Sequence, residues 1–327
     1  MKKARALSLI SGGLDSIIAT WLILQQEIDV VGISFYTPFF NADLSQKAAD
    51  FLKIPLHIID ITEEYIPILK NPKYGYGKNI NPCIDCHAFM CKKAKELLKE
   101  FDADFIITGE VLGERPMSQN KQSLKIVEKH SGAEDILLRP LSAKLLPPTK
   151  PEREGAIDRE KLLDIKGRSR KIQLEFAKKI GLKEIPTPAG GCLLTEPNFS
   201  RRLTDLLKYS NNIEKRDLEL LKIGRHFRLD PKIKVIVGRK KEENEKLLEL
   251  AKLEDTIIKA EEPSPIVFIP NINLKDRELL EVIGRIAAHY SDHRDNNKVK
   301  VEIKTREEEK ILEVEPYKKE EFPFKPV

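Results

Sequence analysis

Two short stretches of the 327-residue chain carry cysteines at spacings that could do chemistry. The first, NPCIDCH, places Cys83 and Cys86 with two residues between them and just ahead of His87. The second, PAGGCLLT, places Cys192 directly behind two glycines. Thiols grouped in this way can ligate a metal, form a disulfide or carry sulfur as nucleophiles. Each of these chemistries would make a different protein.

The CIDCH string also fits the C-x-x-C-H pattern of haem attachment, which belongs to exported proteins. The basic start MKKAR is followed by an apolar run too short for a signal peptide or a membrane span. We therefore expect a cytoplasmic protein, in which a disulfide is disfavoured. A structural zinc site needs four ligands, and no second C-x-x-C pair completes one. Cys91 falls on an amphipathic segment and is expected to be a buried apolar residue.

The strongest signal for phosphate binding is SGGLDS, between an apolar run typical of a buried strand and an apolar helix. Two glycines let the backbone approach an anion closely, and the start of the helix offers N–H groups and a favourable dipole. The spacing fits neither the Walker A pattern nor GxGxxG. Asp15 could help to place a magnesium ion. The predicted nucleotide-binding loop consists of Ser11, Gly12, Gly13, Leu14, Asp15 and Ser16.

This loop resembles the PP-loop of ATP pyrophosphatases, enzymes that split ATP into AMP and pyrophosphate to adenylate a substrate. The resemblance implies that the adenine lies near the end of the second strand, around Ile33, Ser34 and Phe35. It also implies that Gly109, at the end of a later strand, lies beside the nucleotide. Both placements agree with the rule that ligands bind outside the carboxyl ends of parallel strands.

The cysteine pattern on a PP-loop scaffold resembles tRNA thiolases, in particular the bacterial 2-thiouridine synthases. In that family a base carbonyl is adenylated, a cysteine persulfide attacks the activated carbon, and a second cysteine helps to release the sulfur. Cys86 matches the first family cysteine and Cys192 the second, the expected persulfide bearer. With Asp15, these two form the predicted catalytic set. A lowered thiol pKa at a loop or a helix start would favour such a nucleophile.

The chain departs from that pattern, since His87 stands where asparagine is usual and Cys83 is an additional cysteine. A C-x-x-C pair with one remote cysteine resembles instead the PP-loop thiolases that hold a 4Fe-4S cluster by three cysteines. In those proteins one iron stays free to bind incoming sulfide. The ligands would be Cys83, Cys86 and Cys192. Persulfide and cluster chemistry both remain open at this point.

The stretch TGEVLGERPMSQ resembles the thiolase class that makes 4-thiouridine, which implies that Glu110, Arg115 and Gln119 lie on the rim of the active site. Basic residues nearby could follow an RNA backbone, although scattered Lys and Arg also serve solubility. The positions expected to contact RNA are Arg115, Arg168 and Arg170, with Arg139, Lys144 and Lys150 as further basic positions.

The apolar patterning supplies the elements that must hold these residues. Short apolar runs alternate with amphipathic segments through the first half, which predicts an α/β fold with a parallel sheet covered on both faces. The expected strands are 5–10, 30–36, 56–61 and 104–110, and the expected helices are 16–26, 44–54, 88–101 and 170–182. We expect a catalytic domain over 1–200, a basic helical connector over 201–230 and a smaller α+β domain over 231–327.

The last domain resembles the RNA-binding module of ribosome-quality-control proteins of the fibronectin-binding-like family, through IVGRKKEEN, SPIVFIPN and IAAHYSDHR. The resemblance implies that Arg239 and Lys240 contact phosphates. His289 and His293 lie one helical turn apart, and we expect ordinary helix surface there because no carboxylate motif adjoins them.

Together these features predict an ATP-dependent tRNA sulfurtransferase that uses ATP, Mg²⁺ and, in the cluster alternative, a 4Fe-4S centre. Its partners would be tRNA and a sulfur donor, without a membrane. The net charge of +5 permits nucleic-acid binding without demanding it. Two alternatives are a PP-loop ligase or amidotransferase that adenylates a small-molecule carboxylate, and a non-catalytic RNA-binding factor regulated by ATP.

Overall fold

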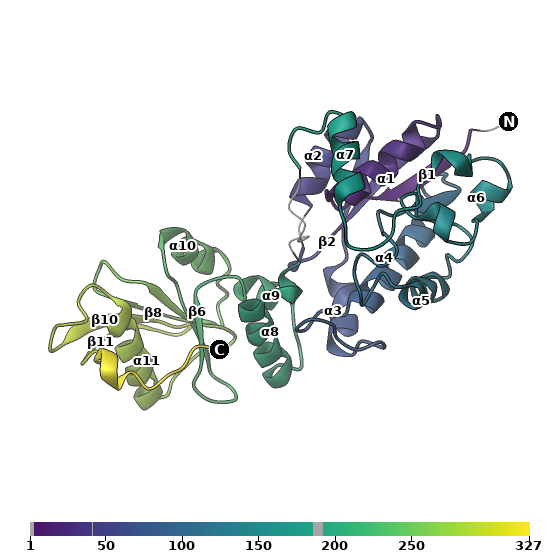
Figure 1. Ribbon diagram of the computed structural model, residues 1–327. Helices are drawn as coiled ribbons and strands as arrows, with labels where there is room; N and C mark the ends of the chain where they lie inside the picture. The colour runs from purple at the N-terminus through teal and green to yellow at the C-terminus, as the bar shows by residue number, and fades with distance from the viewer. Residues whose placement is uncertain (1–2, 41, 186–191) are drawn as a thin grey trace. The chain divides into compact units, whose positions relative to one another are not determined.

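The computed structural model describes residues 3–40, 42–185 and 192–327. The chain divides into two compact units, Met1–Thr195 and Glu196–Val327 (Figure 1). The division lies five residues before the end predicted for the catalytic domain. The segment 201–230, expected to be a separate connector, belongs to the second unit. We describe each unit by itself.

The first unit is built on a five-stranded sheet in the order β3-β2-β1-β4-β5, and every neighbouring pair of strands is parallel. The predicted parallel α/β sheet is therefore confirmed. The strands are β1 (Arg5–Leu9), β2 (Asp29–Tyr36), β3 (Leu56–Asp60), β4 (Phe105–Ile107) and β5 (Leu137–Leu138). The helices are α1 (Leu14–Leu24), α2 (Asp43–Leu52), α3 (Thr62–Lys70), α4 (Cys83–Leu97), α5 (Lys121–Ser131), α6 (Lys150–Arg153) and α7 (Lys171–Lys179), with short 3₁₀ turns η1 (Ala143–Leu145), η2 (Arg159–Lys161) and η3 (Leu193–Thr195).

Alternate residues of the central strands face two different cores, as the period of a β-strand requires. Leu7 of β1 and Ile106 of β4 pack in the cluster that contains Ala88 and Ala94 of α4. Their chain neighbours Ala6 and Phe105 pack in the cluster that contains Ile23 of α1. Because helices cover both faces, the sheet is buried and the ends of its strands are the part left to bind ligands.

The second unit contains a six-stranded antiparallel sheet in the order β11-β10-β8-β9-β7-β6. Its core packs α11 against one part of the sheet, and a second cluster includes residues of α9, α10 and β9. The strands are β6 (Arg225–Arg228), β7 (Lys234–Val237), β8 (Thr256–Ala260), β9 (Ile266–Ile269), β10 (Val299–Lys304) and β11 (Glu309–Val314). The helices are α8 (Pro197–Tyr209), α9 (Lys215–Leu220), α10 (Lys241–Glu249) and α11 (Arg277–Tyr290), with a 3₁₀ turn η4 (Lys319–Glu321).

Two local expectations differ from the structure. The segment 200–229 looked helical throughout, but it ends in β6, whose Phe227 is completely buried in the second core. The helix expected from residue 88 begins at Cys83 instead. Cys83 and Cys86 therefore lie in the first turns of α4, directly behind the Asn81-Pro82 turn.

Candidate active site

The predicted nucleotide loop forms the turn from β1 into α1. Gly12 has a φ of +75°, and a Cβ built there would lie 2.4 Å from the backbone of Leu44, so only glycine fits. Gly13 is the residue directly before α1, and it has no side chain to cap the backbone N–H groups at the start of that helix. The Ser16 hydroxyl donates to the Gly13 carbonyl at 2.8 Å, which fixes the turn. The start of α1 therefore keeps the features of an anion-binding helix terminus.

Gly109 lies against this loop. A Cβ built on Gly109 would stand 2.4 Å from the backbone nitrogen of Ser16 and 2.6 Å from the carbonyl carbon of Asp15. The end of β4 thus touches the start of α1 backbone to backbone, which only glycine permits.

Ser34 and Phe35, expected near the adenine, point into the fold. The Ser34 hydroxyl donates to Ser45 at 2.8 Å, and Ser45 donates in turn to the Ile10 carbonyl at 2.9 Å. Phe35 packs in the core with α4. Their side chains are therefore used inside the protein, and only their backbone is available to a nucleotide.

Asp15 is surrounded by polar residues from distant parts of the chain. Burial raises the pKa of its carboxyl group, while Arg170, Gln173 and Arg115 hold that pKa down. Arg115 and Arg170, which are also the positions expected to contact RNA, both lie near enough to Asp15 to lower the pKa of its carboxyl group. Arg168, two residues before Arg170, is exposed.

Cys83 and Cys192 both lie near enough to Cys86 to contribute to its raised thiol pKa, although Cys192 is distant in sequence from the other two. Cys86 itself is 8% exposed. The Tyr65 hydroxyl lies beside the Cys86 thiol and is completely buried. All four cysteines are free thiols. Cys91 is 2% exposed in the core, which confirms the expectation for it.

The thiol pKa values run against the expected activation. Burial raises the pKa of Cys86 far above its ordinary value of 9.0 and that of Cys192 to about 11. The pKa of Cys83 is also raised by burial, and nearby Arg115 offsets part of the effect for Cys83 and Cys192. A lowered pKa, which would favour a nucleophilic thiol, is therefore not found in the unliganded site, because these thiols are desolvated more strongly than they are compensated by positive charge.

The turn that carries Cys192 is tied to the other side of the site by backbone contacts. Asn79 donates from Nδ2 to the Thr195 carbonyl at 2.7 Å, and the Leu193 amide donates to the Phe39 carbonyl at 2.9 Å. Thr195 in turn donates to the carbonyl of Cys192 at 2.8 Å. The two glycines before Cys192 lie outside the described residues. These contacts hold Cys192 next to the loop that leads into α4.

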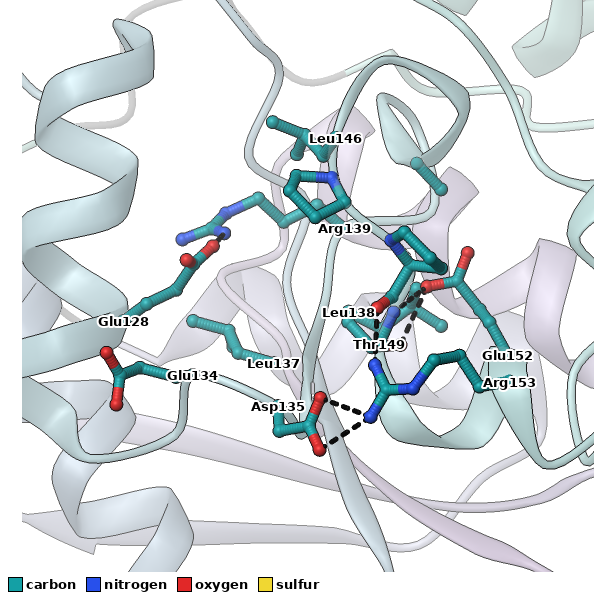
Figure 2. Close-up of a pocket in the computed structure, with 13 residues that line it drawn as sticks. Glu128, Glu134, Asp135, Leu137, Leu138, Arg139, Leu146, Thr149, Glu152 and Arg153 are labelled. Carbon is teal, nitrogen blue, oxygen red and sulfur yellow. Dashed lines mark hydrogen bonds and ion pairs between the residues drawn. The ribbon is translucent and has the colours of Figure 1, made fainter.

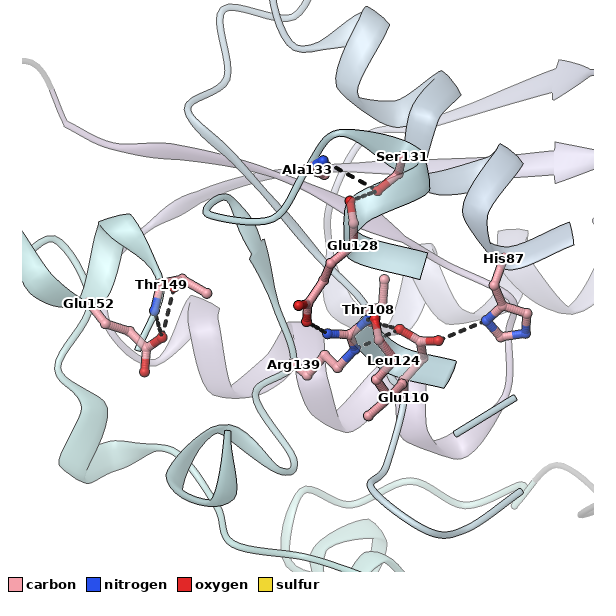
Figure 3. Close-up of polar contacts among 10 residues, drawn as sticks. All are labelled: His87, Thr108, Glu110, Leu124, Glu128, Ser131, Ala133, Arg139, Thr149 and Glu152. Carbon is pink, nitrogen blue, oxygen red and sulfur yellow. Dashed lines mark hydrogen bonds and ion pairs between the residues drawn. The ribbon is translucent and has the colours of Figure 1, made fainter. Parts of the chain in front are cut away.

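A charge network joins His87, the residue after Cys86 in the chain, to Glu110 and Arg139 (Figure 3). His87 Nδ1 is 2.8 Å from Glu110 Oε1, and Arg139 donates from Nε to Glu110 Oε2 at 2.8 Å. Arg139 also pairs with Glu128. The Arg139 charge and the His87 contact keep the pKa of Glu110 well below its usual range despite complete burial.

Two rim expectations are therefore corrected. Glu110 is 4% exposed and Gln119 is 6% exposed, so neither stands on a solvated rim. Arg139 is 2% exposed and cannot follow an RNA backbone, because its guanidinium is used by Glu110 and Glu128. The basic, proline-containing sequence around Arg139 gave no sign of burial.

A cavity of about 220 Å³ lies on the other side of Arg139, between α5, β5 and α6 (Figure 2). Its charged lining residues are largely paired with one another: Asp135 accepts two hydrogen bonds of 2.8 Å from Arg153, and Arg139 pairs with Glu128. None of the residues predicted for the nucleotide loop or the cysteine site lines it.

In the second unit, Arg239 and Lys240 lie at the start of α10 and are exposed. Both are paired with acids: Arg239 Nε donates to Glu243 at 3.0 Å, and Lys240 Nζ lies 3.5 Å from Glu242. His289 and His293 each contact a backbone carbonyl, that of Tyr317 at 2.6 Å and that of Glu262 at 3.0 Å. Each histidine thus has a structural partner. The expectation of one helix surface is wrong for His293, because α11 ends at Tyr290 and His293 lies in the turn that follows.

Sequence reasoning missed Glu114, Gln173 and Tyr65. Gln173 is completely buried on α7 and Tyr65 on α3, although both lie in polar sequence. Among residues 3–40, 42–185 and 192–327, no group of three or more His, Cys, Asp and Glu side chains could hold a metal ion. In that part of the chain no helix has both the length and the apolar character needed to cross a bilayer.

Comparison with known proteins divides the chain in the same two parts. Residues 2–144 match the family model described as thiamine biosynthesis protein (ThiI), and residues 224–325 match the model described as NFACT protein RNA binding domain. A tRNA-specific 2-thiouridylase of Karelsulcia muelleri is 32% identical over 140 residues, covering 39% of this chain and 36% of that protein. A probable tRNA sulfurtransferase of Anoxybacillus flavithermus is 26% identical over 198 residues, 49% of each chain.

The chain thus spans between about a third and half of the length of these curated relatives. Among solved structures, a complex of 4-thiouridine synthetase with RNA and bound ATP is similar at a TM-score of 0.40 and 21% identity, covering 59% of this chain and 42% of that one. Both family resemblances drawn from the sequence are confirmed: the first unit carries a region similar to the ThiI family, and the second carries one similar to NFACT RNA-binding domains.

Proposed function

We propose that this protein is an ATP-dependent tRNA sulfurtransferase, which adenylates a nucleobase carbonyl and replaces its oxygen with sulfur. The observation that carries the proposal is that Cys192 lies near Cys86 although the two are distant in sequence. The same unit contains the predicted phosphate-binding loop, whose backbone Gly109 contacts. The relatives named as 2-thiouridylase and tRNA sulfurtransferase support it, and so does the match to an RNA-binding domain.

The chemistry starts at the nucleotide loop. The base carbonyl oxygen attacks the α-phosphorus of ATP, the bond to the β-phosphate oxygen breaks, and pyrophosphate leaves. The N-terminus of α1 and the arginines Arg115 and Arg170 are suited to stabilise the charge on these phosphates. The former carbonyl oxygen is now bonded to AMP, which makes it a good leaving group.

Sulfur then attacks the activated carbon, and AMP departs with the oxygen. In the persulfide alternative the outer sulfur is carried on Cys192, and Cys86 attacks the inner sulfur. This breaks the sulfur–sulfur bond of the persulfide, leaves the outer sulfur on the base and forms a disulfide between the two cysteines. A thiol reductant must open that disulfide before the next cycle. The buried thiols favour the protonated form, and the positive charge of Arg115 assists ionisation of Cys192.

In the cluster alternative, Cys83, Cys86 and Cys192 would hold a 4Fe-4S centre and would have to move closer together to do so, because as placed among the described residues they do not form a metal-binding group. Three thiols are a chemically suitable donor set, and Cys83 is the residue that this alternative explains better than a persulfide does. When bound, such a centre supplies an iron with an open position for sulfide. Iron content and colour of anaerobically purified protein distinguish the alternatives, since a brown protein that loses its absorbance in Cys83→Ser requires the cluster.

The function is tested by incubating the protein with ATP, a sulfur source and tRNA, then digesting the tRNA and weighing the nucleosides. We expect a thionucleoside, with AMP and pyrophosphate as coproducts. Cys86→Ser and Cys192→Ser should abolish it, and Cys91→Ala is the matched control because Cys91 lies in the core. Failure to form a thionucleoside with any tRNA pool contradicts the proposal. Unchanged release of pyrophosphate in both serine variants, with no thionucleoside formed by the parent protein, would favour a ligase that needs no cysteine.

A further inference from the structure

Polar atoms without partners gather beside the nucleotide loop. Asp15 Oδ1, Glu114 Oε2 and both amide atoms of Gln173 are buried and have no hydrogen bond of ordinary length and angle among the described residues, although the Gln173 amide lies close enough to Asp15 to lower the pKa of its carboxyl group. Gln173 is 0% exposed, so solvent does not satisfy its amide. Buried polar groups in native proteins are nearly always paired, and a group of exceptions points to something that binds there.

These side chains come from three parts of the fold that are held together firmly. Leu14 of α1 and Ala177 of α7 share one core cluster, and the rings of Trp21 and Phe176 meet edge to face at 6.4 Å. This packing brings the Gln173 amide beside the Asp15 carboxylate.

Glu114 is brought in by a separate set of contacts. Leu112 forms an isolated parallel bridge with Lys166, and the Gly167 amide donates to the Leu112 carbonyl at 2.7 Å. The loop after β4 is thereby held against the segment that leads into α7. Glu114 lies within the electrostatic reach of both Asp15 and Arg170.

The charges of this cluster fit a phosphate together with a cation. Arg115 and Arg170 are suited to anionic oxygens, whereas Asp15 and Glu114 repel each other and would repel a bare phosphate. A divalent cation between the carboxylates and the phosphate oxygens would remove the repulsion between the carboxylates and the repulsion between carboxylates and phosphate. Magnesium bound with nucleotides takes one or two carboxylates, phosphate oxygens and waters, and an amide can serve as a ligand or hold one of those waters.

We propose that Asp15, Glu114 and Gln173 form a divalent-cation subsite that holds magnesium against the phosphates of ATP. The subsite rests on the proposed function, because it needs ATP on the nucleotide loop. Asp15 and Glu114 supply carboxylate oxygens, and Gln173 supplies its amide oxygen or a hydrogen bond to a metal-bound water. Glu114 and Gln173 are the new members of the site.

The test measures how strongly a cation and ATP promote each other's binding. Equilibrium dialysis gives the affinity for ATP with Mn²⁺ and with EDTA, and the ratio of the two reports the coupling. In Glu114→Gln we expect this ratio to fall by about tenfold or more, the scale on which removal of a metal-site group acts. Glu175→Gln is the matched control, because Glu175 is exposed on α7 and should leave the ratio unchanged.

Ordered water could satisfy the same atoms, and it predicts an unchanged ratio in Glu114→Gln, which would overturn the subsite. Gln173→Glu gives a second readout that does not depend on ATP. A third carboxylate should lower the melting temperature in EDTA and make Mn²⁺ raise it more than in the parent protein. Destabilisation that Mn²⁺ does not relieve would mean a purely structural residue. Absence of ATP binding by the parent protein would overturn the proposed function as well, whereas ATP binding without Mn²⁺ dependence overturns the subsite alone.

Discussion

The cysteines show how far the chemistry of a residue depends on its surroundings. Cys91 and Cys86 lie on the same helix, yet Cys91 belongs to the core while Cys86 meets two other thiols and Tyr65. Burial raises the thiol pKa in both cases, so a low pKa is not what marks the reactive position. What marks the proposed reactive position is the approach of Cys192, distant in sequence, to Cys86 in the unit that also carries the predicted nucleotide loop.

The raised pKa of Cys192 predicts its reactivity in the unliganded, iron-free protein. Its alkylation by iodoacetamide should increase by about tenfold for each pH unit between pH 7 and 10, because only the thiolate reacts and its pKa is about 11. Peptide mass spectrometry measures the rate, with Cys91 as the protected internal control. A rate that levels off below pH 8 would contradict the prediction and indicate an activated thiol.

The buried ion pair between Arg139 and Glu110 predicts that a substitution of Arg139 lowers the stability of the first unit. Arg139→Met leaves Glu110 buried with its charge uncompensated by the guanidinium, and should lower the free energy of unfolding by about 3–5 kcal/mol. Since folding lowers the pKa of Glu110, its contribution is present above the pKa of an unfolded glutamate and is lost as pH falls toward the folded value. Urea unfolding between pH 3 and 7 measures this loss. Arg168→Met, at an exposed position, should change neither quantity.

At the scale of elements, the sequence predicted the parts of the site with strong local patterns. The apolar runs of β1 and β2 and the glycine-rich turn into α1 lie where periodicity and turn chemistry expected them. The loop 111–119 could not be assigned in the same way, and the helix expected over 170–182 gave no sign that Gln173 is buried, because these polar residues become buried only through tertiary contacts. Glu114 and Gln173 therefore carried no sequence signal, and Arg139 carried a misleading one.

The hydrogen bond between Asn79 and η3 predicts that Asn79 helps to position Cys192. Asn79→Ala removes the hydrogen bond to the Thr195 carbonyl, one of the contacts that hold Cys192 beside α4. Thiolation should fall at least several-fold, while ATP binding stays unchanged because the nucleotide loop is not involved. Asn198→Ala is a suitable control, since that side chain accepts only from Arg201 on α8. Equal activity of both variants would show that η3 is held without Asn79.

At the scale of the whole molecule, each unit has its own sheet and its own core, so we expect that the proposed catalysis and the proposed RNA binding can be altered separately. Part of the basic surface proposed for RNA is already paired within the second unit. Arg239 and Glu243 form an exposed ion pair that a phosphate has to displace. The net charge of +5 therefore says less about RNA affinity than the pairing of individual arginines does.

This pairing predicts opposite effects of two neighbouring substitutions on tRNA binding. Glu243→Gln frees Arg239 and should tighten binding, whereas Arg239→Ala should weaken it and reduce the slope of log affinity against log salt by about one. Filter binding at several salt concentrations measures both, with Glu249→Gln at the far end of α10 as the control. Unchanged affinity in both variants would exclude Arg239 from the RNA interface. The rate of ATP turnover without RNA should stay the same in each.

The close backbone contact of Gly109 with the start of α1 restricts how far these two segments can move independently. Because its backbone touches that of Asp15 and Ser16, no soft side chain separates the end of β4 from the start of α1 to absorb a displacement of either one. The next residue, Glu110, is hydrogen-bonded to His87, which follows Cys86 directly in the chain. A shift of the nucleotide loop should therefore also move α4, the helix that carries Cys83 and Cys86, because the backbone contact at Gly109 and the hydrogen bond from Glu110 to His87 connect the two. The proposed adenylation and sulfur-transfer groups would then keep a fixed spacing.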